Sequence, residues 1–202
     1  MRNPFKRKNK EPKGLVKYSY RDFLTLFPLC TAENRNEIIK ALNEEQRPNF
    51  IAGKKVMDDL NGITYGQLDD LSRIKTSPDP LAAAFEILLG LPASEVYALP
   101  VTTVFGFGNF ATKEVERINK LFSDITLEHT ADEVSAGINE LNFGSFGVLD
   151  WYARRMRITN QNEVRSVPWV RIYTCMKNDT AQVAYERRYN QVIINKSKNR
   201  KR

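Results

Sequence analysis

Helix start and stop signals recur along most of this chain, and they restrict its fold more than any other feature. Asp79-Pro80 pairs an N-cap residue with a proline at the first helical position, and Gly90 stands where a left-handed residue ends a helix. Apolar side chains recur at helical spacing between these two signals. Thr130 and Glu133 form the sequence pattern of a capping box at the start of another helix. Each of these signals predicts a helix.

Apolar runs with helical spacing extend this pattern over the rest of the chain. We expect further helices at Tyr20–Phe27, between a Thr31 cap and Pro48, and at about residues 103–122, 148–156, 168–176 and 179–194. Short strands are alternatives at Ile51 and around residues 101–104, but no long run alternates in polarity and there is no βαβ rhythm. The sequence therefore predicts an all-α fold, a compact array of many short helices.

Charge divides the chain into three parts. Residues 1–17 carry a net charge of +6, residues 18–149 carry −8 and residues 150–202 carry +9. The Lys-rich ends hold too few apolar side chains to fold alone, so we expect basic arms that are disordered or extended. The predicted organisation is a basic N-terminal arm at residues 1–17, a helical domain at 18–194 and a basic C-terminal tail at 195–202. Within the helical domain, residues 18–149 are acidic and residues 150–194 are basic and rich in Arg, Trp and Tyr.

The sequence shows no complete catalytic or cofactor signature. His129 is the only histidine, which argues against a zinc site and leaves a Ser-His-acid triad without support. Gly106 and Gly108 begin a phosphate-loop pattern, but Ala111 stands where its third glycine belongs. We interpret these glycines as allowing phenylalanines to pack closely at a helix start. The prediction is a non-enzymatic protein with no catalytic, cofactor-binding or metal-binding residue.

Two other residue groups receive a structural interpretation. Cys30 and Cys175 are expected to be reduced, buried thiols, as in a reducing cytosol. The adjacent carboxylates at 58–59 and 69–70 point in different directions on a helix, which favours a solvated acidic face. A divalent-metal nuclease site formed by Asp58, Asp69 and Asp79 is the alternative that the sequence leaves open.

The C-terminal third holds the densest basic zone, in which arginines alternate with Trp and Tyr. Three interpretations fit this composition: core tryptophans with solvated arginines, a protein–protein interface, or a nucleic-acid contact by charge and stacking. The residues expected at an interface or polyanion contact, including those of both arms, are Lys6, Arg7, Lys8, Lys10, Trp151, Arg154, Arg155, Arg157, Arg165, Trp169, Arg171, Arg187, Arg188, Lys198, Arg200, Lys201 and Arg202.

Several motifs of the chain, taken in order, resemble a known class of proteins. They are residues 63–71, with the pattern Thr64-x-Gly66-x-x-x-x-Leu71, then Asp79-Pro80, residues 87–92, residues 149–156 and Val167-Pro168-Trp169. This succession resembles small helical proteins of tailed-bacteriophage morphogenesis modules, which are virion connector components or tail-assembly factors. The resemblance covers about residues 60–175 and brings no catalytic residues with it. Both basic arms lie outside the pattern.

Together with the charge layout, the resemblance implies a structural subunit of a bacteriophage virion, in the head–tail connector or a portal-proximal ring. Acidic and basic surfaces of neighbouring subunits would attract one another. We expect self-association, contacts with portal or tail proteins, DNA contact confined to the arms, no membrane, and a virion location after synthesis in the host cytoplasm. The alternatives are a tail-assembly chaperone that is absent from the virion and a nucleic-acid-binding packaging protein.

Overall fold

Local capping geometry sets both ends of helix α4 (Pro80–Leu89), as the sequence predicts. The Asp79 side chain accepts a hydrogen bond from the Ala82 amide at 3.0 Å, and Pro80 is the first helical residue. Gly90 ends the helix with a φ of 62°, a conformation that glycine adopts without steric cost. The predicted caps at Thr31 and Thr130 also accept hydrogen bonds from the first turns of their helices, and Asn160 caps a further short helix in the same way.

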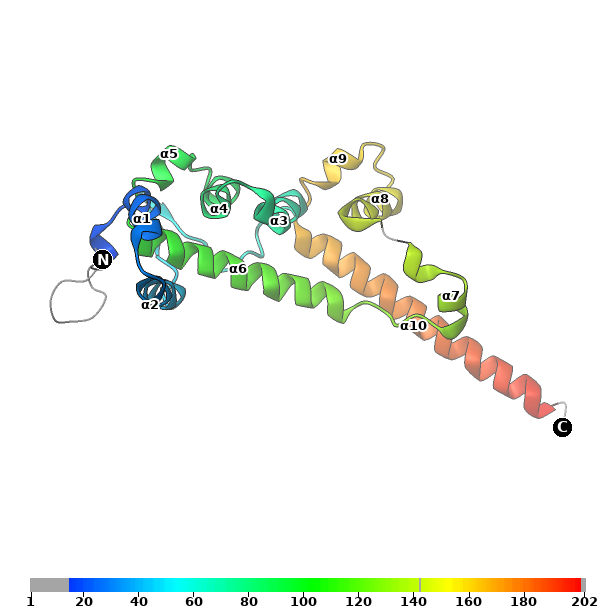
Figure 1. Cartoon of the computed structure of the whole chain (residues 1–202). Helices are drawn as coiled ribbons and strands as arrows, with labels where there is room; N and C mark the ends of the chain where they lie inside the picture. The colour runs from blue at the N-terminus through cyan, green and yellow to red at the C-terminus, as the bar shows by residue number, and fades with distance from the viewer. Residues whose placement is uncertain (1–14, 142, 201–202) are drawn as a thin grey trace. The chain divides into compact units, whose positions relative to one another are not determined.

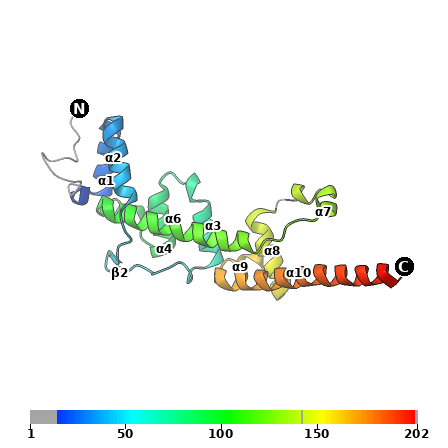
Figure 2. The same ribbon diagram turned by 90° about the horizontal axis from the view of Figure 1, so that it is seen from below.

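The computed structural model describes residues 15–141 and 143–200, and these residues are mostly helical (Figure 1, Figure 2). The other α-helices are α1 (Tyr20–Leu26), α2 (Ala32–Asn43), α3 (Tyr65–Ser72), α5 (Ala93–Val96), α6 (Val101–Asp124), α7 (Ala131–Ser135), α8 (Gly144–Met156), α9 (Gln161–Val164) and α10 (Trp169–Arg200). Short 3-10 helices are η1 (Leu15–Lys17), η2 (Phe27–Leu29), η3 (Ile74–Thr76) and η4 (Ile138–Glu140). Strands β1 (Phe50–Ile51) and β2 (Lys54–Lys55) form an antiparallel hairpin. The predicted all-α class is confirmed, although α6 and α10, with 24 and 32 residues, are not short.

Ordered structure starts earlier in the chain than predicted. The N-terminal arm was expected to extend to residue 17, but residues 15–17 form η1 and the Leu15 side chain is buried. An apolar side chain at this position gains free energy by joining the core. Residues 1–14 lie outside the described residues.

The described residues divide into two compact units. Unit 1 comprises the described residues up to Leu60 together with Gln67–Glu116, and unit 2 comprises Asn61–Gly66 together with the described residues from Arg117 onward. Helices α3 and α6 each contribute residues to both units. The stretch predicted as one helical domain, residues 18–194, therefore contains parts of two units.

Within unit 1, helix α6 anchors the chain that follows α2. The Asn109 side-chain amide donates to the Leu42 carbonyl at 2.9 Å and to the Glu45 carbonyl at 3.2 Å, so it satisfies acceptors at the end of α2. One turn earlier, Gly106 faces the backbone of Gln46, and a Cβ at position 106 would lie 2.2 Å from the Gln46 carbonyl oxygen. The space left by this glycine is thus filled by backbone, whereas the sequence interpretation assigned it to phenylalanine packing.

Unit 2 joins residues 61–66 to the start of α10 by backbone pairing. The Gly66 amide donates to the Arg165 carbonyl at 2.8 Å, and the Trp169 amide donates to the Ile63 carbonyl at 3.3 Å. This pairing fixes the first turn of α10 beside the start of α3 within the unit. The buried side chains of this unit include Ile118, Tyr152, Val164, Trp169 and Ile172.

Helix α10 is continuous where the sequence predicted two helical segments and a tail. Asn178 and Asp179 are typical of a helix start, but the Asp179 carboxylate is bonded to Arg155 at 2.7 Å. The disordered or extended tail predicted from residue 195 is wrong for residues 195–200, which are helical. Extending an existing helix adds one backbone hydrogen bond for each residue, and no Gly or Pro interrupts this stretch. Residues 201–202 lie outside the described residues.

Candidate interaction surface

The basic residues predicted at a contact are not all described by the structure. Six of them, in the terminal stretches, lie outside the described residues: Lys6, Arg7, Lys8, Lys10, Lys201 and Arg202. Arg200 is the last residue of α10. The remaining predicted contact residues all belong to unit 2, on α8, α9 and α10 or directly after them.

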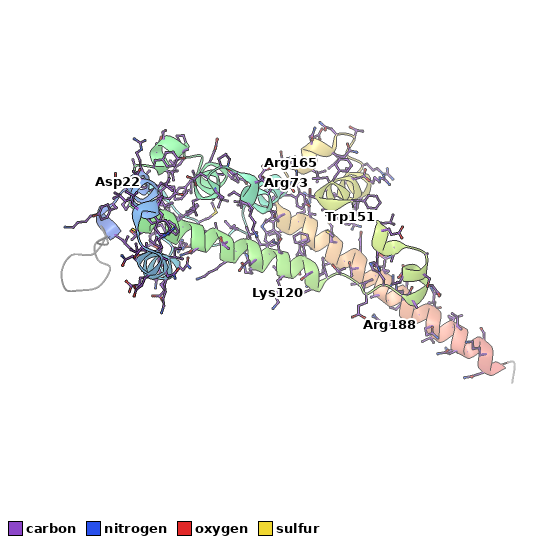
Figure 3. All side chains as sticks on the ribbon, viewed as in Figure 1. Asp22, Arg73, Lys120, Trp151, Arg165 and Arg188 are labelled. Carbon is purple, nitrogen blue, oxygen red and sulfur yellow. The ribbon has the colours of Figure 1, made fainter. Side chains whose placement is uncertain are left out.

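The two tryptophans have different surroundings. Trp169 is 2% exposed, and its ring centroid lies 6.1 Å from those of Phe122 and Tyr173. This burial corrects the prediction that Trp169 takes part in a surface contact, because its indole is enclosed in the core of unit 2. Trp151, on α8 (Figure 3), is half-buried. The Arg155 guanidinium lies 5.9 Å from its ring centroid.

Two arginines tie the helices of unit 2 together. Arg155 bonds to both carboxylate oxygens of Asp179 and so links α8 to α10. A hydrogen bond to the Cys175 side chain and the Asp179 charge raise the pKa of Arg155. Arg187 donates to the Glu133 carboxylate at 2.8 Å, which links α10 to α7. Both guanidinium groups therefore serve the internal structure of unit 2.

Two further arginines have partners within unit 2. Arg154 pairs with Asp150 at 2.7 Å, one turn earlier on α8. Arg165 follows α9 and donates to the Gly66 carbonyl at 3.4 Å (Figure 3). Neither arginine is a free cation on the surface.

The other four predicted cations have no partner among the described residues. Arg157, Arg171, Arg188 and Lys198 are exposed and form no ion pair or side-chain hydrogen bond with any described group. Arg157 ends α8 with a φ of 56°, and Arg188 projects from the C-terminal half of α10 (Figure 3). These residues are the part of the predicted contact set that is available to an outside partner.

The C-terminal half of α10 carries an apolar stripe that the predicted contact set omits. We define the α10 stripe as Tyr185, Tyr189, Val192 and Ile193, which are 58%, 53%, 48% and 44% exposed. Their spacing of i, i+4, i+7 and i+8 places them on one side of the helix, and the two tyrosine rings stack with centroids 6.0 Å apart. Every described side chain at residues 188–199 is exposed, and this half of the helix extends past α7 within unit 2 (Figure 1, Figure 2).

A second exposed apolar group lies on an acidic part of unit 2. We define the acidic segment as the described residues of 124–146, from the end of α6 to the first turn of α8. Its exposed large apolar side chains are Val134, Leu141, Phe143 and Phe146, and Phe143 is 69% exposed. Its acidic residues are Asp124, Glu128, Asp132, Glu133 and Glu140, and it contains no Lys or Arg. Hydrogen bonds from Thr130, followed by the Arg187 charge, lower the pKa of Glu133.

The carboxylates considered for a nuclease site have separate structural partners. Asp58 pairs with Arg47 at 3.0 Å, and the buried Asp69 pairs with Arg73 at 3.3 Å. Asp79 caps α4. In the described ranges, no group of three or more His, Cys, Asp and Glu side chains could hold a metal ion. The structure thus does not bring Asp58, Asp69 and Asp79 together as the divalent-metal nuclease site that the sequence left open.

The remaining reactive side chains are dispersed in the same way. Cys30 is buried as predicted, whereas Cys175 is half-buried, and His129 is exposed. Burial and the Asp79 carboxylate raise the pKa of Tyr20, whose hydroxyl donates to Asp79 at 3.1 Å.

Among the described helices, none has both the length and the apolar character needed to cross a bilayer. No protein-family model, curated protein or solved structure matches this chain.

Proposed function

We propose that this protein is a structural subunit of a multi-subunit assembly and that it acts by binding other subunits. The observation that carries the proposal is the α10 stripe, an exposed apolar face on a half-helix that no other described element of unit 2 covers. Three exposed cations without a described partner, Arg188, Lys196 and Lys198, lie on the same half of α10 as the stripe. A surface of this kind is typical of a helix that docks on a partner.

The free energy gained by burying apolar surface supports burial of the α10 stripe in a complex. Burying apolar surface stabilises a complex by roughly 25 cal/mol per Å², and a tyrosine or phenylalanine can bury about 150–250 Å². Tyr185 and Tyr189 retain more than half of their exposure in the single chain. Helical turns with few tertiary contacts are also only marginally stable in water, so a partner would order this half of α10 as well as cover it.

The motif resemblance supports a more specific setting, the virion of a tailed bacteriophage. There the protein would belong to the head–tail connector or a portal-proximal ring, reached after synthesis in the host cytoplasm. Opposite net charges of −8 on residues 18–149 and +9 on residues 150–202 support attraction between neighbouring subunits. Mass spectrometry of purified particles tests this setting, because a tail-assembly chaperone would be missing from the finished virion.

Light scattering after size-exclusion chromatography tests the assembly function itself. We expect the mass of the full chain to rise above 23.3 kDa as the loading concentration increases. The double variant Tyr189→Gln, Ile193→Gln should stay closer to the monomer mass, since it removes half of the stripe while keeping good helix formers. The matched control is Leu24→Gln, Ile39→Gln, which alters two comparably exposed apolar residues on helices of unit 1.

Three outcomes separate assembly from its alternatives. Loss of mass in the α10 variant but not in the control supports the proposal. A full chain that is monomeric at every concentration and also fails to bind purified portal or tail proteins contradicts it. Equal loss in both variants would show that general apolar exposure, and not the stripe, drives association.

Polyanion binding is a second candidate because Arg157, Arg171, Arg188 and Lys198 are exposed without partners. Filter binding to DNA at two salt concentrations tests it. If these cations contact phosphates, affinity falls steeply with salt, and each Lys or Arg removed reduces the slope by about one. Binding that does not depend on salt would exclude this function.

A further inference from the structure

Opposite charges are concentrated on two parts of unit 2. From Leu121 to Ala153 the sequence has six acidic residues and no Lys or Arg. From Ala181 to Arg200 it has five basic residues and the single acid Glu186. The first stretch contains the acidic segment, and the second contains the α10 stripe. Each part therefore combines exposed apolar side chains with charge of one sign.

The carboxylates of the acidic segment are mostly unused within the chain. Asp124, Glu128, Asp132 and Glu140 are exposed, and their carboxylates form no ion pair or hydrogen bond with any described residue. The same holds for the cations Arg188, Lys196 and Lys198 on α10. The single chain thus leaves complementary charges unpaired on both parts.

One contact inside the chain shows how the two parts fit chemically. Arg187, the first cation of the basic half of α10, donates to the Glu133 carboxylate at 2.8 Å and to the Glu128 carbonyl at 3.1 Å. It therefore binds the acidic segment of its own chain. Farther along α10, Arg188, Lys196 and Lys198 make no such contact with described residues, because that half of the helix extends past α7.

We infer that the C-terminal half of α10 docks on the acidic segment of a second copy of this chain. The tyrosines and aliphatic residues of the α10 stripe cover the exposed phenylalanines and Leu141, while Arg188 and Lys196, on the stripe side of the helix, face the unpaired carboxylates. The inference rests on the proposed assembly function and names its partner and both contact surfaces.

Charge selects this pairing over other pairings of copies. Two α10 helices placed side by side would bring basic residues against basic residues, and two acidic segments would repel in the same way. The contact is heterologous, because each copy offers one surface of each kind, so association continues until a ring closes or a filament grows. Burying two half-exposed tyrosines supplies only part of the roughly 800 Å² per partner of a standard interface, so single contacts are weak and repeated ones are needed.

Charge reversal followed by mixing tests the inference. The tail variant carries Arg188→Glu and Lys196→Glu, and the segment variant carries Glu128→Lys, Asp132→Lys and Glu140→Lys. All five side chains are exposed and unpaired among the described residues, so the fold is retained, which far-UV circular dichroism verifies. Each variant alone should associate about tenfold more weakly than the wild type, as expected for several exposed charge pairs. An equimolar mixture should recover association, because the reversed tail now matches the reversed segment.

The outcomes separate this inference from the function on which it rests. Recovery in the mixture supports it. A wild type that associates normally while neither variant weakens, or a mixture that does not recover, overturns the inference and leaves the assembly function standing. A monomeric wild type that binds a different assembly protein through α10 also overturns it. A monomer that binds only DNA or anionic vesicles overturns both.

Discussion

The close contact between Gly106 and the Gln46 backbone predicts a specific cost for one added methyl group. In Gly106→Ala the new Cβ would lie 2.2 Å from the Gln46 carbonyl oxygen and 3.1 Å from its carbonyl carbon. Alanine gains about 1 kcal/mol of helix propensity over glycine. Overpacking against backbone costs about 1–3 kcal/mol, and disturbing the neighbouring bond from Asn109 to Glu45 costs about 1 kcal/mol more. The free energy of unfolding should therefore fall by about 1–3 kcal/mol.

Gly108→Ala is the matched control, because it lies two residues away on the same helix. Its new Cβ would meet the Leu81 Cδ2 atom at 2.3 Å, the flexible end of a half-buried side chain. Rotation of Leu81 relieves that contact, so the propensity gain offsets the cost to within about 1 kcal/mol. Urea unfolding followed by far-UV circular dichroism measures both variants. A Gly106→Ala variant as stable as the wild type would refute the reasoning.

Two further predictions concern a turn and a titratable cap. Ala52 has a φ of 47° in the hairpin turn, so Ala52→Gly should raise the free energy of unfolding by about 0.5–1 kcal/mol. The control Ala181→Gly, on α10, should lower the free energy of unfolding by a similar amount. Thermal denaturation measures both variants. The folded state lowers the pKa of Glu133, so the stabilising effect of the Glu133 carboxylate is complete at pH values above 4.5, its ordinary pKa. This effect is lost as the pH falls through the lowered pKa of the folded state. The stability difference between wild type and Glu133→Gln should therefore shrink in acid, and a difference independent of pH would contradict this assignment.

Local rules explain which parts of the fold were predictable. The caps predicted at Thr31, Asp79 and Thr130 were correct because a cap depends on its own side chain and the next few amides. The same rules failed at Asp179, since a tertiary partner, Arg155, bonds its carboxylate within a continuous helix. The division into two units depends on contacts between distant segments, which no local pattern records.

The sequence predicted which residue types form the candidate contact set, but it did not predict what surrounds each of these residues in the fold. An interface was one of three interpretations of the zone rich in Arg, Trp and Tyr, and the sequence alone could not show that Trp169 is buried or that Arg187 bonds to Glu133. The α10 stripe was visible as helical spacing of Tyr185 and Tyr189, but the same spacing is typical of residues that face a core. Only the fold shows that these rings are exposed.

Sedimentation equilibrium of the full chain beside its α10 variant tests the central claim most directly. The wild type should show a mass that increases with concentration, and Tyr189→Gln, Ile193→Gln should remain near the 23.3 kDa monomer under the same conditions. The control Leu24→Gln, Ile39→Gln should match the wild type. Wild type and α10 variant with the same mass at every concentration would contradict assembly through this helix.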